Sequence, residues 1–392
     1  MKRKIMILTL LFVLVLSKGI YAQETQEDNT NILEDLTKNV YKQYNVDDLE
    51  GFYVENGLDE VLQYSTLEDF IVGIVKGEVD WDLQQLIQTI KNQLFKELAL
   101  SMNLLARIIF LAVMAAVLNN ISTSFGKNEV NNVAFLVVYL VLIGLIGQSF
   151  YTCVTIGTTT IDSVINFIQA ILPTMFVLLA SVGGIASSSM LSPLVLYIVS
   201  FIGTVINGMV YPLIIASAVV TLINYISSEV NISNLAKLLK ESAIFILGFL
   251  FILFLGVISI QGIAMTTLDG VSVKTAKYAV DLIPFVGGFL ADSMDTIISA
   301  SSLIKNAVGV IGLLIIVAII ALPIIKMFAI MVMFKIAAAI IQPISNEKIV
   351  KCLSDISNYI WLVMACVIVI AFMFFLIITM IILLGDMTVM YR

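Results

Sequence analysis

Histidine is absent from this 392-residue chain, and charged residues make up only 12% of it. The chain therefore lacks the side chain that most often serves as a general base or a metal ligand. Its three cysteines, Cys153, Cys352 and Cys366, are too scattered for a zinc motif and read as small apolar side chains. It contains neither a P-loop nor a glycine-rich dinucleotide-binding turn. We predict that the chain is not an enzyme and uses no cofactor or metal.

Apolar residues, in contrast, make up 60% of the chain. Runs of about 20 apolar residues recur from Leu104 onward, and each is long enough to cross roughly 30 Å of hydrocarbon as a helix. The short alternation typical of barrel strands is missing. The fold class is therefore predicted to be all-α, a polytopic membrane helical bundle of about seven to nine segments. The expected segments are 104–121, 131–152, 164–183, 193–211, 212–227, 242–262, 305–322, 324–341 and 359–384.

The N-terminus has the pattern of a signal peptide, with a basic start at Met1 to Lys4, an apolar core from Ile5 to Leu16 and small residues near Ala22. An uncleaved anchor is the alternative, and either one exports the residues that follow. Residues 23–98 hold 17 of the 28 acidic residues against five lysines, which argues against nucleic acid as a partner. Apolar periodicity predicts a small exported α-helical segment here.

Four prolines indicate an internal duplication. Pro173 aligns with Pro284, and Pro212 with Pro323, at one common offset of 111 residues. We predict that these prolines interrupt membrane helices; chance similarity between apolar sequences is the alternative to a duplication. The resulting division is 1–22 signal peptide, 23–100 exported acidic helical segment, 101–155 first transmembrane hairpin, 156–262 membrane repeat 1 and 263–392 membrane repeat 2.

Polar side chains within the apolar segments are the candidate functional residues. Interrupted helices are tolerated at membrane depth where protein buries them or where they line a water-filled cavity. The candidates for lining such a conduit are Asn166, Gln169, Asn207, Asn224, Gln261, Lys326, Lys335 and Gln342. The alternative for any one of them is bonding between helices or, for the lysines, reaching toward the interface. We predict a subunit of a channel or transport complex, with a self-contained secondary transporter and a non-conducting membrane scaffold as the competing functions.

Several irregular strings resemble a known family. FLGVISIQG (254–262), DGVSVKTAKY (269–278) and DTIISASSLIKN (295–306), extended by Gln342-Pro343 and residues 349–353, resemble the stage III sporulation protein AE family of endospore-forming bacteria. The resemblance covers most of residues 160–384.

This resemblance implies a mother-cell protein of the outer forespore membrane, with residues 23–98 on the non-cytosolic side. The implied function is a subunit of a channel that links mother cell and forespore, which moves small solutes or supports assembly of a secretion-like apparatus. Other membrane subunits of that complex and a separate ATPase are the implied partners, beside membrane lipid. Assembly as a homo-oligomer stays open.

Overall fold

The computed structural model describes residues 50–51, 66, 69, 72–73, 83–124, 129–226, 232–281, 287–344 and 347–390. Side chains of the long helices are described at 88 and over 90–118, 136–226, 232–260, 298–344 and 347–388. The expected signal peptide, most of the exported segment, Pro284 and the side chain of Gln261 lie outside these residues.

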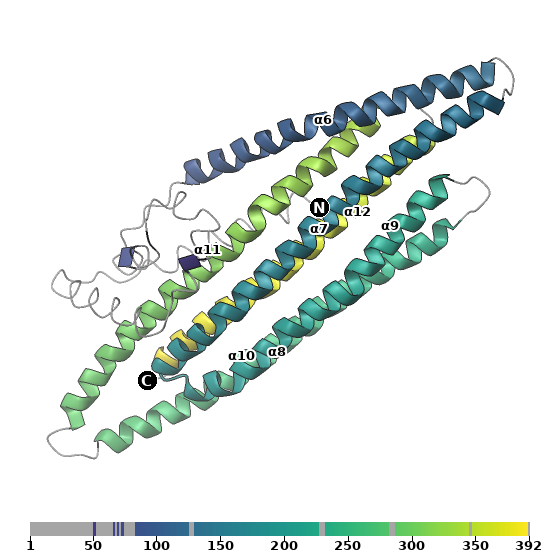
Figure 1. Cartoon of the computed structure of the whole chain (residues 1–392). Coiled ribbons are helices and arrows are strands. Elements are labelled where there is room, and N and C mark those ends of the chain that lie inside the picture. The colour runs from purple at the N-terminus through teal and green to yellow at the C-terminus, as the bar shows by residue number, and fades with distance from the viewer. Residues whose placement is uncertain are drawn as a thin grey trace.

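The described chain forms an elongated bundle of long helices that lie side by side (Figure 1). They are α6 (Leu83–Ser124), α7 (Glu129–Ser181), the continuous run of α8 (Ile185–Val205), the π-helix η2 (Ile206–Val210) and α9 (Tyr211–Ile226), α10 (Ser233–Asp281), α11 (Gly287–Ile341) and α12 (Glu347–Met390). Within the described residues, six stretches are long and apolar enough to cross a membrane. The predicted all-α membrane bundle is confirmed, whereas the count of seven to nine segments is not.

Three pairs of expected segments are joined into continuous helices. Segments 131–152 and 164–183 lie almost wholly within α7, 193–211 and 212–227 almost wholly within the α8–η2–α9 run, and 305–322 and 324–341 within α11. The 55 residues of α11 span roughly 82 Å at about 1.5 Å per residue, whereas the hydrocarbon core is roughly 30 Å thick. The long helices therefore extend beyond the hydrocarbon on at least one side.

The prolines change these helices less than expected. The chain stays helical through Pro173 in α7 and through Pro323 in α11. Each proline lacks an N–H and so removes one backbone hydrogen bond without ending its helix. Immediately before Pro212, the five residues of η2 widen into a π-helical turn. The helix thus adjusts its winding at Pro212 rather than stopping.

A tight turn holds α7 against α8. Gly183 adopts φ of 100°, the left-handed conformation that glycine reaches without steric cost. Its N–H donates to the carbonyl of Ala180 at 3.0 Å, and the N–H of Gly184 donates to that of Leu179, also at 3.0 Å. These bonds satisfy carbonyl groups at the end of α7 that would otherwise lack partners. The two helices are consequently antiparallel neighbours.

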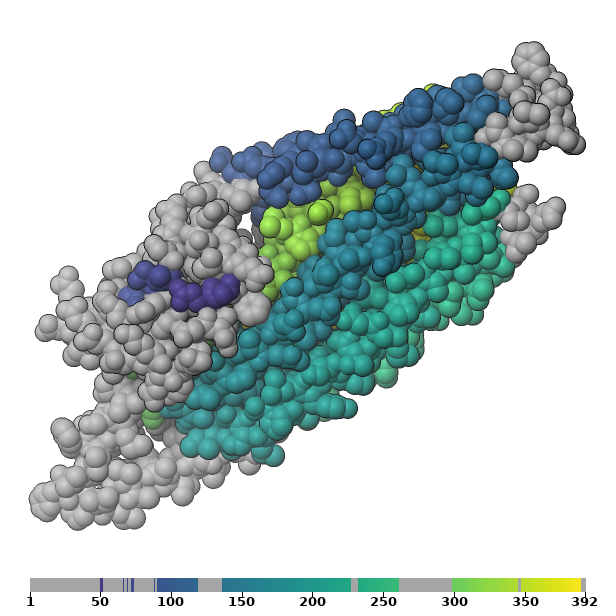
Figure 2. All heavy atoms as spheres, in the orientation of Figure 1, coloured from purple at the N-terminus to yellow at the C-terminus, as the bar shows by residue number. Residues whose placement is uncertain are grey.

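The centre of the bundle is α12, which contacts α7, α8, α9, α10 and α11. Cys153, Cys352 and Cys366 are buried and free, as expected for small apolar side chains. One side of α7 packs into this centre. The opposite side forms part of the outer surface, with α6 and α11 on one side of it and the α8–α9 run on the other (Figure 2). That outer side of α7 carries the candidate site.

Candidate functional site: a polar stripe on α7

The exposed positions of α7 recur at helical spacing and are polar throughout its middle part. They are Gln148, Tyr151, Thr152, Thr155, Thr159, Asp162, Ser163, Asn166 and Gln169, which we call the polar stripe. This interval of roughly 22 residues covers roughly 33 Å, close to the hydrocarbon thickness of about 30 Å. On either side of it the exposed positions of α7 include apolar Val141 and Val177. The stripe is thus bounded at both ends and about as long as a bilayer core is thick.

The hydroxyl groups of the stripe bond to their own helix. Thr152 Oγ1 donates to the carbonyl of Gln148 at 3.0 Å, and Thr155 Oγ1 donates to that of Tyr151 at 3.1 Å. Thr159 continues the pattern with a bond of 2.8 Å to the carbonyl of Thr155. Such bonds keep the segment helical and make hydroxyl groups tolerable in lipid as well as in water. Whether the stripe faces lipid or water therefore depends on its carboxylate and amide groups.

Two side-chain hydrogen bonds link the stripe to the neighbouring helix. Asn207 Nδ2 donates to Asp162 Oδ1 at 2.8 Å, and Gln169 Nε2 donates to Ser200 Oγ at 3.2 Å. Three residues expected from the sequence, Asn166, Gln169 and Asn207, therefore lie on one face. The side chain of Asn166 is exposed and makes no hydrogen bond within the described part of the chain.

Asp162 was not singled out from the sequence, although a signal for it was present. It is the only charged residue between Glu129 and Glu229. An isolated ionisable residue in so long an apolar stretch is itself an indication of a functional position in a membrane protein. The missing information was the helical phase, which puts Asp162 on the same side as Asn166 and Gln169.

The outer surface of α10 shows at which height along the bundle apolar side chains are exposed. The Ser217 hydroxyl in α9 donates to the carbonyl of Ala236 in α10, which fixes the register of these antiparallel helices. About ten residues, or about 15 Å, further along both helices, Asn207 is level with residue 246 of α10. At that level α10 exposes Phe245 and Phe249 by 71% and 51%.

Exposed phenylalanine side chains at this height are stable in contact with lipid, whereas an ionised aspartate is not. Placing a charged side chain against hydrocarbon costs about 2.5–3.5 kcal/mol by insertion measurements. A bilayer that covers Phe245 and Phe249 would impose that cost on Asp162 if the stripe also faced lipid. The stripe therefore needs water or polar protein against it.

The π-helical turn η2 positions Asn207. Within and after it Ile206, Val210 and Tyr211 are buried, while Asn207 is exposed toward Asp162. The Tyr211 hydroxyl is buried without a hydrogen bond to the described residues, and a Cβ atom at Gly157 would lie 2.6 Å from it. Glycine at 157 therefore leaves the space that Tyr211 occupies. Single π-helical turns of this kind are frequent at functional sites.

The remaining predicted residues lie outside the stripe, although Lys326 on α11 is close enough to Cys153 of α7 to interact with it electrostatically. Asn224 Oδ1 accepts a hydrogen bond from the N–H of Ile232 at 3.1 Å, so it holds the connection between α9 and α10. Lys326 and Lys335 are both exposed on α11, but nine residues at about 100° each place them on opposite sides of the helix. The two lysines cannot line one conduit together from α11.

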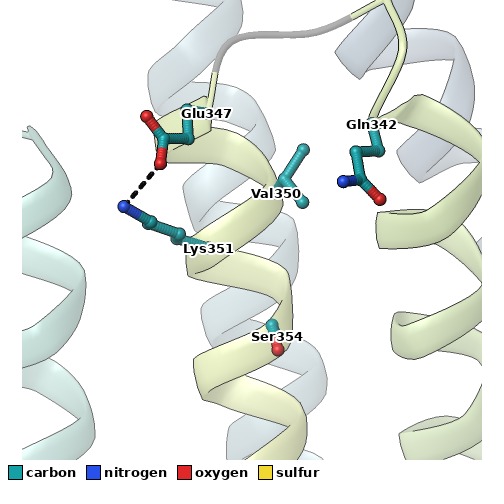
Figure 3. Close-up of a pocket in the computed structure, with 5 residues that line it drawn as sticks. All are labelled: Gln342, Glu347, Val350, Lys351 and Ser354. Carbon is teal, nitrogen blue, oxygen red and sulfur yellow. Dashed lines mark ion pairs between the residues drawn. The ribbon is translucent and has the colours of Figure 1, made fainter.

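Gln342 lies just after α11, at the edge of a hollow of about 540 Å³ beside the start of α12. Figure 3 shows Glu347 and Lys351 paired on α12, with Val350 and Ser354 facing the hollow and Gln342 opposite them. The ion pair measures 2.6 Å, but both side chains are largely exposed, so it contributes little to stability. Gln342 thus belongs to a solvent-exposed turn of the bundle.

A buried ion pair near the end of α12 was also missed. Lys305 is fully buried, and its Nζ donates to the carbonyl of Ile382 at 2.7 Å and to Asp386 Oδ1 at 3.0 Å. Asn306 Nδ2 donates to the same carboxylate oxygen at 3.1 Å. Any side chain at Gly385 would collide with Lys305. This cluster joins α11 to α12 through charge-assisted hydrogen bonds.

A second missed network joins α7, α9 and α12 near the other end of the bundle. The Tyr359 hydroxyl lies 2.7 Å from Ser217 Oγ and 2.9 Å from Thr221 Oγ1. Tyr225 donates to Asp355 Oδ2 at 2.6 Å and accepts at its backbone carbonyl from the Tyr139 hydroxyl at 2.8 Å. Each hydroxyl has a partner, so this network is structural helix bonding.

The helices and the stripe together define a multi-pass α-helical membrane protein whose helix α7 carries a polar outer face. The family model for stage III sporulation protein AE matches residues 65–385, so the chain belongs to that family. The stage III sporulation protein AE of Bacillus subtilis strain 168 is 32% identical over 375 residues, which cover 94% of this chain and 93% of the relative. No solved structure matches the chain. The resemblance predicted from the sequence is confirmed, and the protein is a sporulation-related membrane component.

Proposed function

We propose that this protein is a membrane subunit of a channel or transport complex between mother cell and forespore, and that the polar stripe forms part of the wall of its conduit. One observation carries the proposal: Asp162 and Asn207 are exposed at the height where α10 exposes Phe245 and Phe249. Lipid suits the phenylalanines, and water suits the carboxylate. Membership of a sporulation family supports the cellular setting.

In this proposal the chain lies in the mother-cell-derived outer forespore membrane, with residues 23–98 between the two forespore membranes. Its role is not catalytic. Other membrane subunits complete the complex, and a separate ATPase supplies the energy, in keeping with a sequence that lacks a P-loop.

We also infer that residues 156–262 and 263–392 are membrane repeats. Pro212 lies inside the long run that ends with α9 and precedes α10, and Pro323 lies inside α11, which precedes α12. Two long helix pairs with prolines at related positions support a duplication, which is common in transport proteins.

The test is a flux assay with the purified full-length chain in liposomes. Thr155→Cys is introduced after alanine replaces the three buried native cysteines, and Phe249→Cys on the outer side of α10 serves as the control. We expect a bulky water-soluble thiol reagent to block solute efflux through the Thr155→Cys protein and to leave the control unchanged. Absence of flux together with an unlabelled stripe would favour the scaffold, and saturable flux unaffected by the reagent would favour a carrier.

A further inference from the structure

We propose that the edge of the polar stripe beside η2 binds a monovalent metal cation. Its ligands are the Asp162 carboxylate, the Thr158 hydroxyl and the backbone carbonyl groups of Asn207 and Gly208. All of these are oxygen atoms, the donors that hard cations such as Na⁺ prefer. The site goes beyond the proposed conduit and does not depend on it, because a cation can bind here whether or not a solute passes.

Two contacts place η2 against one stretch of α7. Near the start of η2, Asn207 Nδ2 donates to Asp162 Oδ1 at 2.8 Å. Directly after η2, the Tyr211 hydroxyl lies so close to α7 that a Cβ atom at Gly157 would be 2.6 Å from it. The two segments therefore run antiparallel here, and these two contacts bracket the proposed site.

Pro212 leaves carbonyl groups of η2 without a helical donor. The N–H of Tyr211 donates to the carbonyl of Ile206, five residues earlier. The next donor would be residue 212, but proline has no N–H and so cannot bond to Gly208, four residues back, or to Asn207, five residues back. At membrane depth such carbonyl groups need another partner. In transporters, carbonyl groups of interrupted helices coordinate Na⁺.

The side chains beside these carbonyl groups supply further oxygen atoms. Asp162 Oδ1 accepts from Asn207, which leaves Oδ2 for a cation. Thr158 precedes Asp162 by one helical turn and lies on the same side of α7. Its hydroxyl donates to the carbonyl of Thr155 at 3.0 Å and keeps lone pairs for a ligand. Gly208 is exposed, and nothing lies within 4 Å of the place of a Cβ atom there, so a cation can approach from outside.

The charge of the site matches a single positive charge. Asp162 is the only charged residue between Glu129 and Glu229, so η2 and its flanking helices add no second charge. Lys326 of α11 interacts with Cys153, but Cys153 and Asp162 are nine residues apart and therefore lie on opposite sides of α7. A monovalent cation would neutralise the carboxylate and lower the cost of placing it at membrane depth. A divalent cation would leave one charge uncompensated.

The experiment measures thermal unfolding of the purified full-length protein in lipid nanodiscs, in NaCl and in choline chloride at equal ionic strength. We expect the Tm of the wild type to rise by about 3 °C when Na⁺ is at roughly ten times its dissociation constant. Asp162→Asn should abolish this rise, and Thr158→Val should weaken Na⁺ binding about tenfold because one ligand is lost. Equal Tm values in the two salts for the wild type, or an unchanged Na⁺ response in Asp162→Asn, would overturn the site.

Pro212→Ala tests the carbonyl ligands. Its N–H can donate to the carbonyl of Gly208, so the affinity for Na⁺ should fall about tenfold while the helix becomes more regular. Pro323→Ala, the matched change inside α11, should keep the wild-type affinity. Binding of radioactive sodium to the same samples gives the affinity without reference to stability. Unchanged binding in Pro212→Ala would overturn the carbonyl ligands, and because no flux is measured, either result leaves the conduit function to its own test.

Discussion

Two surfaces at one height of the bundle carry opposite chemistry. The outer side of α10 exposes Phe245 and Phe249, whereas the outer side of α7 exposes Asp162 beside Asn207. Both helices contain stretches long and apolar enough to cross a membrane. Hydropathy averages over the whole circumference of a helix, but the contact with lipid depends on one side of it. We therefore expect water or polar protein beside α7 at the height where α10 contacts lipid.

Moving a charge to α10 should have the largest effect. Phe249→Asp places a carboxylate against hydrocarbon and should destabilise the inserted protein by about 3 kcal/mol. Asn166→Asp, the matched change at the same height on the stripe, should cost less than about 0.5 kcal/mol if water reaches this surface as proposed. Both values follow from unfolding of the purified protein in lipid nanodiscs and from its amount in membranes. Equal losses from the two variants would remove the distinction between the surfaces.

The buried ion pair between Lys305 and Asp386 provides a second carboxylate. The effect of removing it can be compared with the effect of removing the Asp162 carboxylate. Asp386→Asn leaves the fully buried Lys305 without its counter-ion. We expect a loss of about 2 kcal/mol, less than the 3–5 kcal/mol typical of enclosed pairs because the Asp386 side chain is 39% exposed.

The matched control for that change is Asp162→Asn, which should lower stability by less than about 1 kcal/mol because Asp162 has no buried cation to leave behind. Thermal unfolding of both variants under one lipid condition compares them. A larger loss for Asp162→Asn would mean that Asp162 is an enclosed structural group.

Removing the amide that holds Asp162 should have an intermediate effect. Asn207→Ala deletes the hydrogen bond to Asp162 Oδ1 and should lower stability by about 1 kcal/mol. Met209→Ala, two residues further along η2, removes an exposed apolar side chain and provides the control. Urea or thermal unfolding in the same nanodiscs measures both. If Asn207→Ala leaves the stability unchanged, the η2 backbone rather than the Asn207 amide holds this edge of the stripe in place.

The smallest effect on stability is expected at Asn166. Asn166→Leu removes an exposed amide that makes no hydrogen bond with the described residues, so the free energy of unfolding should change by less than about 0.5 kcal/mol. Conduction should nevertheless fall, because the change makes the stripe apolar and less wet near its Gln169 end. Liposome efflux and unfolding are measured on the same preparation. A stabilisation of more than about 1 kcal/mol would indicate that this surface faces lipid.

The sequence alone predicted the fold class and three residues of the stripe. Composition and apolar run length were sufficient for the membrane bundle, and Asn166, Gln169 and Asn207 were recognised as polar groups in apolar segments. The expected interruption between residues 152 and 164 was wrong, because threonine and serine hydroxyls there bond to their own helix and keep α7 continuous.

Other features depended on distances between helices that no local pattern contains. Lys305 and Asp386 are 81 positions apart and meet only because α11 and α12 pack antiparallel. The separation of Lys326 and Lys335 was, in contrast, available from helical geometry, since nine residues bring a helix to its opposite side. Polar residues in apolar segments were therefore easier to recognise from the sequence than the side of the helix on which each one lies.

The most direct test of the difference between the two surfaces is to measure water access to α7 and α10 at the same height. Asn166→Cys and Phe249→Cys, each in the chain without native cysteines, are treated in native membranes with a membrane-impermeant thiol reagent. The account predicts rapid labelling of the cysteine at position 166 and none at position 249. Equal protection of both positions, with the protein folded and assembled, would contradict it.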